Sequence, residues 1–194
     1  MADFNIAHRL TQKAEGGYAN NPNDKGGETY RGIARKRHPD WKGWRIVDML
    51  RISEKNNFEN ALARQPLLNE LVDKFYKAEF WDTLNLDTLQ SQKIANELYD
   101  TGVNMGTGVA GEFLQRALNV YNLNGKKFSD LKVDGDLGPK TIATFNGLDE
   151  RGKGVIYKLL NVLQGAKYIA ICESDPGQEI FVNSWFSRVF EAAA

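Results

Sequence analysis

Apolar residues recur at helical spacing in one segment of this chain after another, and that repetition limits the fold more than any other feature. The clearest segments are 66–75, 90–105, 109–121 and 154–173, where apolar side chains return every three or four positions. Outside residues 16–31, no run alternates apolar and polar side chains as a half-buried strand does. The sequence therefore predicts a mainly α fold, with a small β-hairpin or loop region near residues 16–31.

Local signals predict where several helices begin and end. A short helix over 32–37 should end at His38, because Pro39 disfavours helical geometry in the residue before it. Ser53 is the expected N-cap of a later helix, and Pro66 is the expected first residue of the next one.

At 194 residues, the chain is long enough for one sizeable core or two small subdomains. Its aromatic-rich part ends near residues 84–90, and mostly helical patterns follow. We place a boundary there and predict two regions, 1–88 and 89–194, packed against each other.

The charge balance bears on the class of partner. Twenty-five Lys and Arg residues cancel twenty-five Asp and Glu residues, whereas nucleic-acid binders usually carry a clustered positive excess. We therefore expect no nucleic-acid partner. Residues 24–45 hold seven basic residues against three acids, which is typical of a solvated face or, alternatively, of a surface that attracts an anionic polymer.

Neither a disulfide nor a membrane span is predicted. Cys172 is the only cysteine, and no run approaches the roughly eighteen apolar residues that a membrane helix needs. The N-terminus lacks an apolar run typical of a cleavable signal, so we expect a protein made without one. We also expect a monomer.

The sequence predicts no metal and no cofactor. Two histidines and one cysteine are too few for a typical zinc site. Residues 106–111, GTGVAG, match a dinucleotide-binding pattern, but the residues before them have helical spacing and not strand spacing. Close packing between helices explains these glycines better.

Most of the candidate chemistry lies in residues 15–33, EGGYANNPNDKGGETYRGI. Three carboxylates, Glu15, Asp24 and Glu28, lie there with the hydroxyl of Thr29. Gly16, Gly17, Gly26 and Gly27 permit tight turns that can bring these groups into one cleft. Loop acids also form ordinary turns and caps, which is the structural alternative.

Glu15 is the best candidate for a general acid. It follows a short amphipathic segment with Asp3 as the expected N-cap and apolar residues at Phe4, Ala7, Leu10 and Ala14. A carboxyl at that helix end borders the core and faces the negative end of the helix dipole. Both effects raise the pKa of a carboxyl toward the range that proton donation near neutral pH requires.

Two carboxylates beside a sugar-binding cleft fit glycoside cleavage. That reaction needs an acid for the leaving oxygen and a second group that attacks or activates water. Glu15 can be the acid, and the second role stays open between Asp24, Glu28 and a water held by Thr29. Sugar rings could stack on four aromatic residues, for which core packing is an equal alternative: Tyr18, Tyr30, Trp41 and Trp44.

The same residues resemble the signature of glycoside hydrolase family 108, the phage- and bacterium-encoded N-acetylmuramidases once described as secretion activators. The matching positions are Glu15-Gly16-Gly17-Tyr18, Asp24, Gly26-Gly27, Thr29 and Gly32-Ile33. The resemblance implies a lysozyme-like helical fold that cuts the β-1,4 bond between N-acetylmuramic acid and N-acetylglucosamine. The family's catalytic glutamate falls on Glu15. Arg31 and Ala34 depart from the pattern, which leaves open how water and sugar are held.

The resemblance continues into the second half of the chain, where the family carries a predicted peptidoglycan-binding region. The segments that match are 103–106 with Asn104, 114–118, 133–141, and Trp185 with Arg188. Asn104 is thereby added to the candidate substrate-binding residues.

We therefore predict an N-acetylmuramidase that acts on peptidoglycan glycan strands in the periplasm or cell wall after synthesis in a bacterial cytoplasm. A phage endolysin and a secretion activator are both compatible with this family. Two other activities stay open: a lytic transglycosylase, and a non-catalytic wall-binding or secretion-accessory protein.

Overall fold

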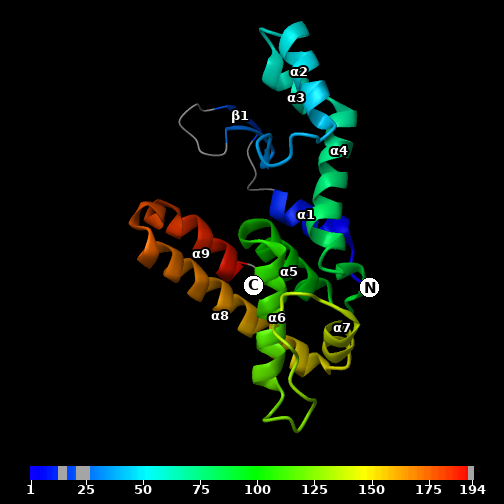
Figure 1. Ribbon diagram of the computed structural model, residues 1–194, viewed down its shortest axis with the longest axis vertical. Helices are drawn as coiled ribbons and strands as arrows, with labels where there is room; N and C mark the ends of the chain where they lie inside the picture. Colours follow the sequence, from blue (N-terminus) through cyan, green and yellow to red (C-terminus); the bar gives the residue numbers. More distant parts are fainter. Residues whose placement is uncertain (13–16, 21–26, 192–194) are drawn as a thin grey trace. The chain divides into compact units, whose positions relative to one another are not determined.

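The computed structural model describes residues 1–12, 17–20 and 27–191. Within those ranges the chain forms nine α-helices and one three-stranded antiparallel sheet (Figure 1), so the mainly α prediction is confirmed. The chain folds as two compact units. We call residues 8–79 the N-terminal unit and residues 1–7 with 80–194 the C-terminal unit. The division falls between Glu79 and Phe80, a few residues before the expected boundary.

Helices α2, α3 and α4 form most of the N-terminal unit. They span Gly43–Ser53, Phe58–Ala63 and Pro66–Tyr76, and α1 spans Phe4–Gln12. Pro66 is the first residue of its helix, as predicted, where its missing N–H is not needed. The buried faces of these helices supply the core of the unit, which contains Trp44, Val47, Leu62, Leu68 and Val72.

A small sheet packs into this unit. Strand β1 (Tyr18–Asn20) pairs with β2 (Glu28–Tyr30), which confirms the hairpin within residues 16–31. The helix predicted over 32–37 is wrong, because β3 (Ile33–Ala34) forms there and pairs with β2. Arg31 and Gly32 have φ of 44° and 77°, a left-handed turn that reverses the chain and buries Ile33.

The N-cap predicted at Ser53 is also wrong. Ser53 is the last residue of α2, and α3 begins only at Phe58. The buried face of α2 continues through Val47 and Leu50, so packing extends this helix as far as Ser53. Ser53 therefore ends one helix and does not cap the start of the next.

Three long helices form the core of the C-terminal unit: α5 (Gln92–Met105), α6 (Thr107–Tyr121) and α8 (Glu150–Ser174). They bury Leu98, Leu114 and Leu160 almost completely. The shorter elements of the unit are α7 (Pro139–Asn146), α9 (Val182–Glu191) and three single-turn or irregular helices, η1 (Lys77–Asp82, which starts in the other unit), η2 (Leu86–Thr88) and η3 (Pro176–Phe181).

The first residues of the chain belong to this unit through Phe4. Its ring meets Trp81 and Tyr99 edge-on, each at 5.8 Å between centroids. The backbone N–H of Ala2 donates to the carbonyl of Leu89 at 3.1 Å. A buried aromatic cluster of this kind ties the N-terminus to α5.

The glycines at 106–111 serve helix packing. Gly106, with φ of 97°, joins α5 directly to α6. A Cβ on Gly111 would lie 1.9 Å from the carbonyl oxygen of Gly135, so only glycine permits this approach of loop to helix.

Helix α8 is, among the residues that the structure describes, the one helix long and apolar enough to cross a membrane by length and composition. Its Ile156, Leu160 and Tyr168 are buried, and it packs against α5, α6 and α9. A core helix meets the same criteria, so composition alone assigns no membrane role.

A long loop joins α6 to α7 over residues 122–138. Three carboxamide side chains, spaced three or four residues apart at the end of α6, hold it: Gln115, Asn119 and Asn122. We call these three side chains the carboxamide row. Asn119 both donates to the carbonyl and accepts from the N–H of Leu131, each at 2.8 Å. The row supplies the backbone partners that a loop without secondary structure otherwise lacks.

Candidate active site

Two of the predicted catalytic residues, Glu15 and Asp24, lie outside the residues that the structure describes. Their roles therefore stay predictions. The described neighbours on β1 and β2 show what surrounds this part of the chain.

Thr29 lies in the middle of β2. It is half-buried and pairs with Ala19 on one side and Ala34 on the other. Its position in a regular sheet between two strands fixes its backbone, which is a requirement for a residue that orients water.

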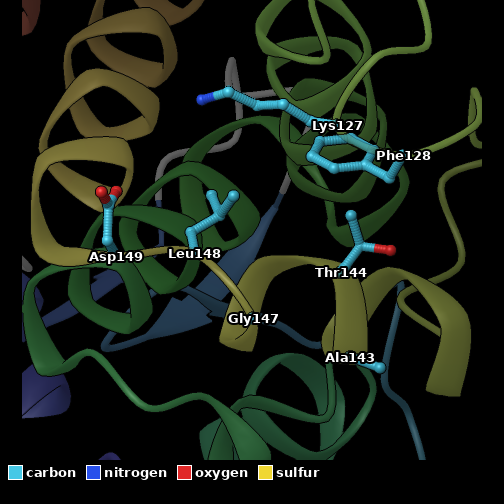
Figure 2. A pocket seen from close by; sticks show the side chains of 7 residues that line it. All are labelled: Lys127, Phe128, Ala143, Thr144, Gly147, Leu148 and Asp149. Atoms are coloured by element: carbon cyan, nitrogen blue, oxygen red, sulfur yellow. The ribbon is translucent and has the colours of Figure 1, made fainter.

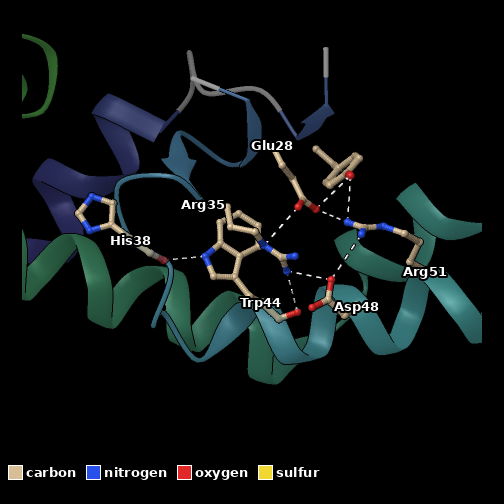
Figure 3. Close-up of polar contacts among 7 residues, drawn as sticks. Glu28, Arg35, His38, Trp44, Asp48 and Arg51 are labelled. Atoms are coloured by element: carbon tan, nitrogen blue, oxygen red, sulfur yellow. Dashed lines mark hydrogen bonds and ion pairs between the residues drawn. The ribbon is translucent and has the colours of Figure 1, made fainter. Parts of the chain in front are cut away.

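Glu28 occupies the centre of a charged network in the N-terminal unit (Figure 3). Its Oε2 lies 3.2 Å from Nε of Arg35, and its Oε1 accepts from the guanidinium of Arg51 and from the Tyr18 hydroxyl at 3.1 Å. Asp48 joins the two arginines, at 2.8 Å from Arg35 Nη2 and 3.4 Å from Arg51 Nη1. We call these five residues the Glu28 network.

The Glu28 network links β1, β2 and the chain after β3 to helix α2. Only 12% of the Glu28 side chain is exposed. Its Oε1 accepts hydrogen bonds from Tyr18 and Arg51, the second of them charge-assisted, and its Oε2 forms an ion pair with Arg35. Burial and the adjacent Glu28 carboxylate raise the pKa of Tyr18, so its phenol keeps its proton and donates. This arrangement suits Glu28 as an anchor of the hairpin better than as a base.

Two of the predicted sugar platforms are core residues. Tyr30 and Trp44 are only 2% and 4% exposed. The Tyr30 hydroxyl donates to the carbonyl of Leu62 at 3.3 Å, and Nε1 of Trp44 donates to the carbonyl of His38 at 2.8 Å. Because neither ring offers a face to a ligand, we do not carry them forward as sugar platforms.

Trp41 and Tyr18 keep part of their surface accessible. Trp41 stacks on Tyr30 at 6.4 Å and donates Nε1 to the carbonyl of Leu71 at 3.3 Å. The Tyr18 ring meets Phe58 edge-on at 5.0 Å. Both rings are held firmly by packing, and both stay candidates for sugar contact.

Asn104 lies in the C-terminal unit, near the end of α5. It is exposed, and its Nδ2 donates to the carbonyl of Asp100 at 2.8 Å. A side chain that bonds to the carbonyl four residues earlier in its own helix is ordinary for a helix surface, so this bond by itself indicates no binding role.

Sequence reasoning missed two features. Arg35 counted only toward a basic segment, and Arg51 and Asp48 were not singled out, although their spacing of three on one helix places them side by side. Glu97 was also missed: it is 4% exposed on α5, and burial, with the nearby Asp100 charge, raises its pKa to about 8. Its place in an apolar helical stripe was the available signal.

The fold is the mainly α, lysozyme-like fold that the sequence predicted. Residues 8–106, just over half of the chain, match the family Glycosyl hydrolase 108, and the chain belongs to that family. Residues 109–190 match a Predicted Peptidoglycan domain. Together, these matches support a peptidoglycan hydrolase.

A solved structure has a similar fold. The structure of Brucella abortus SagA superposes with a TM-score of 0.62 at 21% sequence identity, covering 97% of this chain and 90% of that one. At this identity the likeness shows the fold alone. No curated protein matches the chain significantly.

Proposed function

We propose that this protein is an N-acetylmuramidase that hydrolyses the β-1,4 bond between N-acetylmuramic acid and N-acetylglucosamine in the bacterial cell wall. The observation that carries the proposal is the pairing, in one chain, of a glycosyl hydrolase 108 region over 8–106 with a peptidoglycan domain over 109–190. The first region supplies the chemistry and the second selects the polymer.

Glu15 is the proposed general acid, because it is the glutamate that falls on the family's catalytic position. Asp24 is the proposed second carboxylate, and Thr29 is proposed to hold water. The bonding of Glu28 supports this order: its Oε1 already accepts from Arg51 and Tyr18, and its Oε2 is ion-paired with Arg35, so this carboxylate is poorly placed to activate water.

The test is turbidity loss of purified cell walls with the wild type and with Glu15→Gln. Removal of a general acid typically lowers a rate by about 10²–10⁴-fold. Glu79→Gln, a change of the same kind at a residue outside the proposed site, is the matched control and should retain the wild-type rate. Equal rates for the wild type and Glu15→Gln would remove the acid role.

A wall-binding accessory protein without turnover is the second candidate, favoured by the domain match over 109–190. It predicts that the wild type binds sacculi and releases no soluble fragments.

A further inference from the structure

A hollow of about 520 Å³ lies on the C-terminal unit, where the long loop after α6 meets α7 and the start of α8 (Figure 2). This volume falls in the range of small-ligand sites, which is about 300–1,000 Å³. The loop contributes Lys127 and Phe128, α7 contributes Ala143 and Thr144, and the turn before α8 contributes Gly147, Leu148 and Asp149. We call it the α7 hollow.

Opposite charges line the α7 hollow. The exposed ammonium of Lys127 is held 3.5 Å from the centroid of the Tyr121 ring. The Asp149 carboxylate is oriented by its role as N-cap of α8, because its Oδ1 accepts from the N–H of Gly152 at 2.8 Å. Figure 2 shows these two residues on different walls, with the apolar side chain of Leu148 beside Asp149 and the Phe128 ring beside Lys127.

Helix α7 adds a hydroxyl to the lining of the α7 hollow. The Thr144 hydroxyl donates to the carbonyl of Lys140 at 2.8 Å, and its oxygen keeps the capacity to accept a further hydrogen bond. The lining therefore combines a cation, an anion, a hydrogen-bond acceptor and two apolar surfaces.

The loop that forms one wall of the α7 hollow is held in place by several hydrogen bonds. Loops of more than about 12–15 residues without secondary structure are usually functional or disordered. This one is held by the carboxamide row, and Asn122 Oδ1 accepts from Gly125 N–H at 3.0 Å while its backbone carbonyl accepts from Lys127 N–H at 3.0 Å. Leu123 and Asn124, both at φ of 57°, adopt a left-handed conformation that is costly for non-glycine residues. A wall fixed in this way costs little conformational entropy when a ligand binds.

We propose that the α7 hollow binds the peptide stems of peptidoglycan, through a segment that carries both a carboxylate and an ammonium group. Lys127 pairs with the carboxylate, Asp149 pairs with the ammonium, and Phe128 and Leu148 cover the aliphatic part between them. Opposite charges in one hollow complement a zwitterion, which a neutral glycan chain is not. The inference rests on the proposed function and deepens it: the C-terminal unit recognises the peptide, while the glycan is cut elsewhere.

The test measures binding of the tripeptide L-Ala–D-Glu–diaminopimelate to the full chain carrying Glu15→Gln, by titration calorimetry. In that background, Lys127→Gln and Asp149→Asn each remove one charge, and Asn keeps the helix cap. Loss of one charge-assisted contact should weaken binding by about tenfold. Lys126→Gln, at an exposed lysine next in sequence that does not line the hollow, is the matched control and should bind as the parent does.

A second peptide separates loss of the charge contact from a general structural effect of the substitution. The same tripeptide with its side-chain ammonium acetylated should bind the parent about tenfold more weakly, and Asp149→Asn should no longer distinguish the two peptides. Asp149→Ser, which also retains a cap, should behave like Asp149→Asn.

Two results would overturn the inference: no tripeptide binding by the parent, or equal affinities for the parent and both charge variants. Because muropeptide release by the wild type is measured separately, wall hydrolysis without peptide binding rejects the hollow and leaves the proposed function standing. Charge-dependent peptide binding without wall hydrolysis supports the hollow and rejects the proposed function.

Discussion

Gln115 and Asp134 hold each other through two hydrogen bonds. Oε1 of Gln115 accepts from the backbone N–H of Asp134 at 2.9 Å, and its Nε2 donates to the Asp134 carboxylate at 2.8 Å. The same carboxamide also accepts from Gly135 N–H and donates to the Asp136 carbonyl. One side chain, 1% exposed, therefore holds the turn at 134–136 against α6.

Replacing Gln115 with leucine should strongly destabilise the C-terminal unit. Two backbone N–H groups and one carbonyl would lose their partner, and each hydrogen bond of this kind contributes about 0.5–1.5 kcal/mol. Urea unfolding measures the loss. Lys132→Ala, which removes only an exposed ion pair to Asp134, should cost much less. Equal losses for the two variants would mean that the carboxamide does not hold the turn.

Gly111→Ala should also destabilise this turn, because the new methyl group would collide with the Gly135 carbonyl. Overpacking of this kind typically costs about 1–3 kcal/mol. Gly108→Ala is the control on the same helix, since nothing lies within 4 Å of a Cβ there, and alanine should be neutral or stabilising. Thermal unfolding of the two variants decides the point. Similar melting temperatures would contradict the close packing of Gly111 and Gly135.

Glu97 should make the stability of the protein fall as pH rises. Its pKa is about 8 in the fold against 4.5 for an ordinary glutamate, so the folded state binds the proton more tightly. The contribution of Glu97 to stability is therefore full below about pH 4.5, and it declines by about 1.4 kcal/mol per pH unit as the pH rises toward 8. Two charged groups act on Glu97: Asp100 raises the pKa of Glu97, and Lys93 lowers it. Burial and the nearby Glu97 charge in turn raise the pKa of Tyr157.

Glu97→Gln tests this dependence, because glutamine keeps the shape of the protonated acid and does not titrate. Urea unfolding at pH 5 and pH 9 should show the variant gaining several kcal/mol on the wild type at the higher pH. A difference between variant and wild type that is the same at both pH values would show that Glu97 does not titrate in this range.

The Glu28 network should contribute much more to stability than an exposed ion pair. A double-mutant cycle with Glu28→Gln and Arg51→Met should give a coupling energy of about 1.5–3 kcal/mol, since the bond is charge-assisted and Glu28 is nearly buried. The exposed pair Glu70 and Lys74 on α4 is the control and should give about 0.3–0.5 kcal/mol. Coupling of Glu28 and Arg51 no larger than the control would remove the anchoring role.

Helical spacing and single residues with strong backbone preferences predicted most of the fold. Pro66 begins α4 because its ring suits the first helical position, and the spacing of Leu98 and Leu114 marks buried helix faces. Ser53 misled the prediction because a cap preference is worth about 1 kcal/mol, less than the packing of the helix that continues through it. The third strand was missed because a two-residue strand has no measurable alternation.

The candidate site was harder to predict, because contacts between distant residues do not follow from spacing. Trp44 and Tyr30 are aromatic residues in a polar-looking segment, and only the fold shows that their rings are buried. Glu28 similarly looked available until Arg35 and Arg51, 7 and 23 positions away, proved to hold it. Glu15 was predicted from its place at the end of a helical segment and from the resemblance to the family signature. Its role stays a prediction, which the activity of Glu15→Gln tests.

The most direct test of the central claim is mass spectrometry of the fragments that the wild type releases from sacculi in ¹⁸O-labelled water. A muramidase must place one ¹⁸O atom on the new reducing end of N-acetylmuramic acid. Glu15→Gln must release this labelled product far more slowly than the wild type does. Unlabelled anhydro-muramic ends, labelled N-acetylglucosamine ends, or no released fragments would each contradict the proposed reaction.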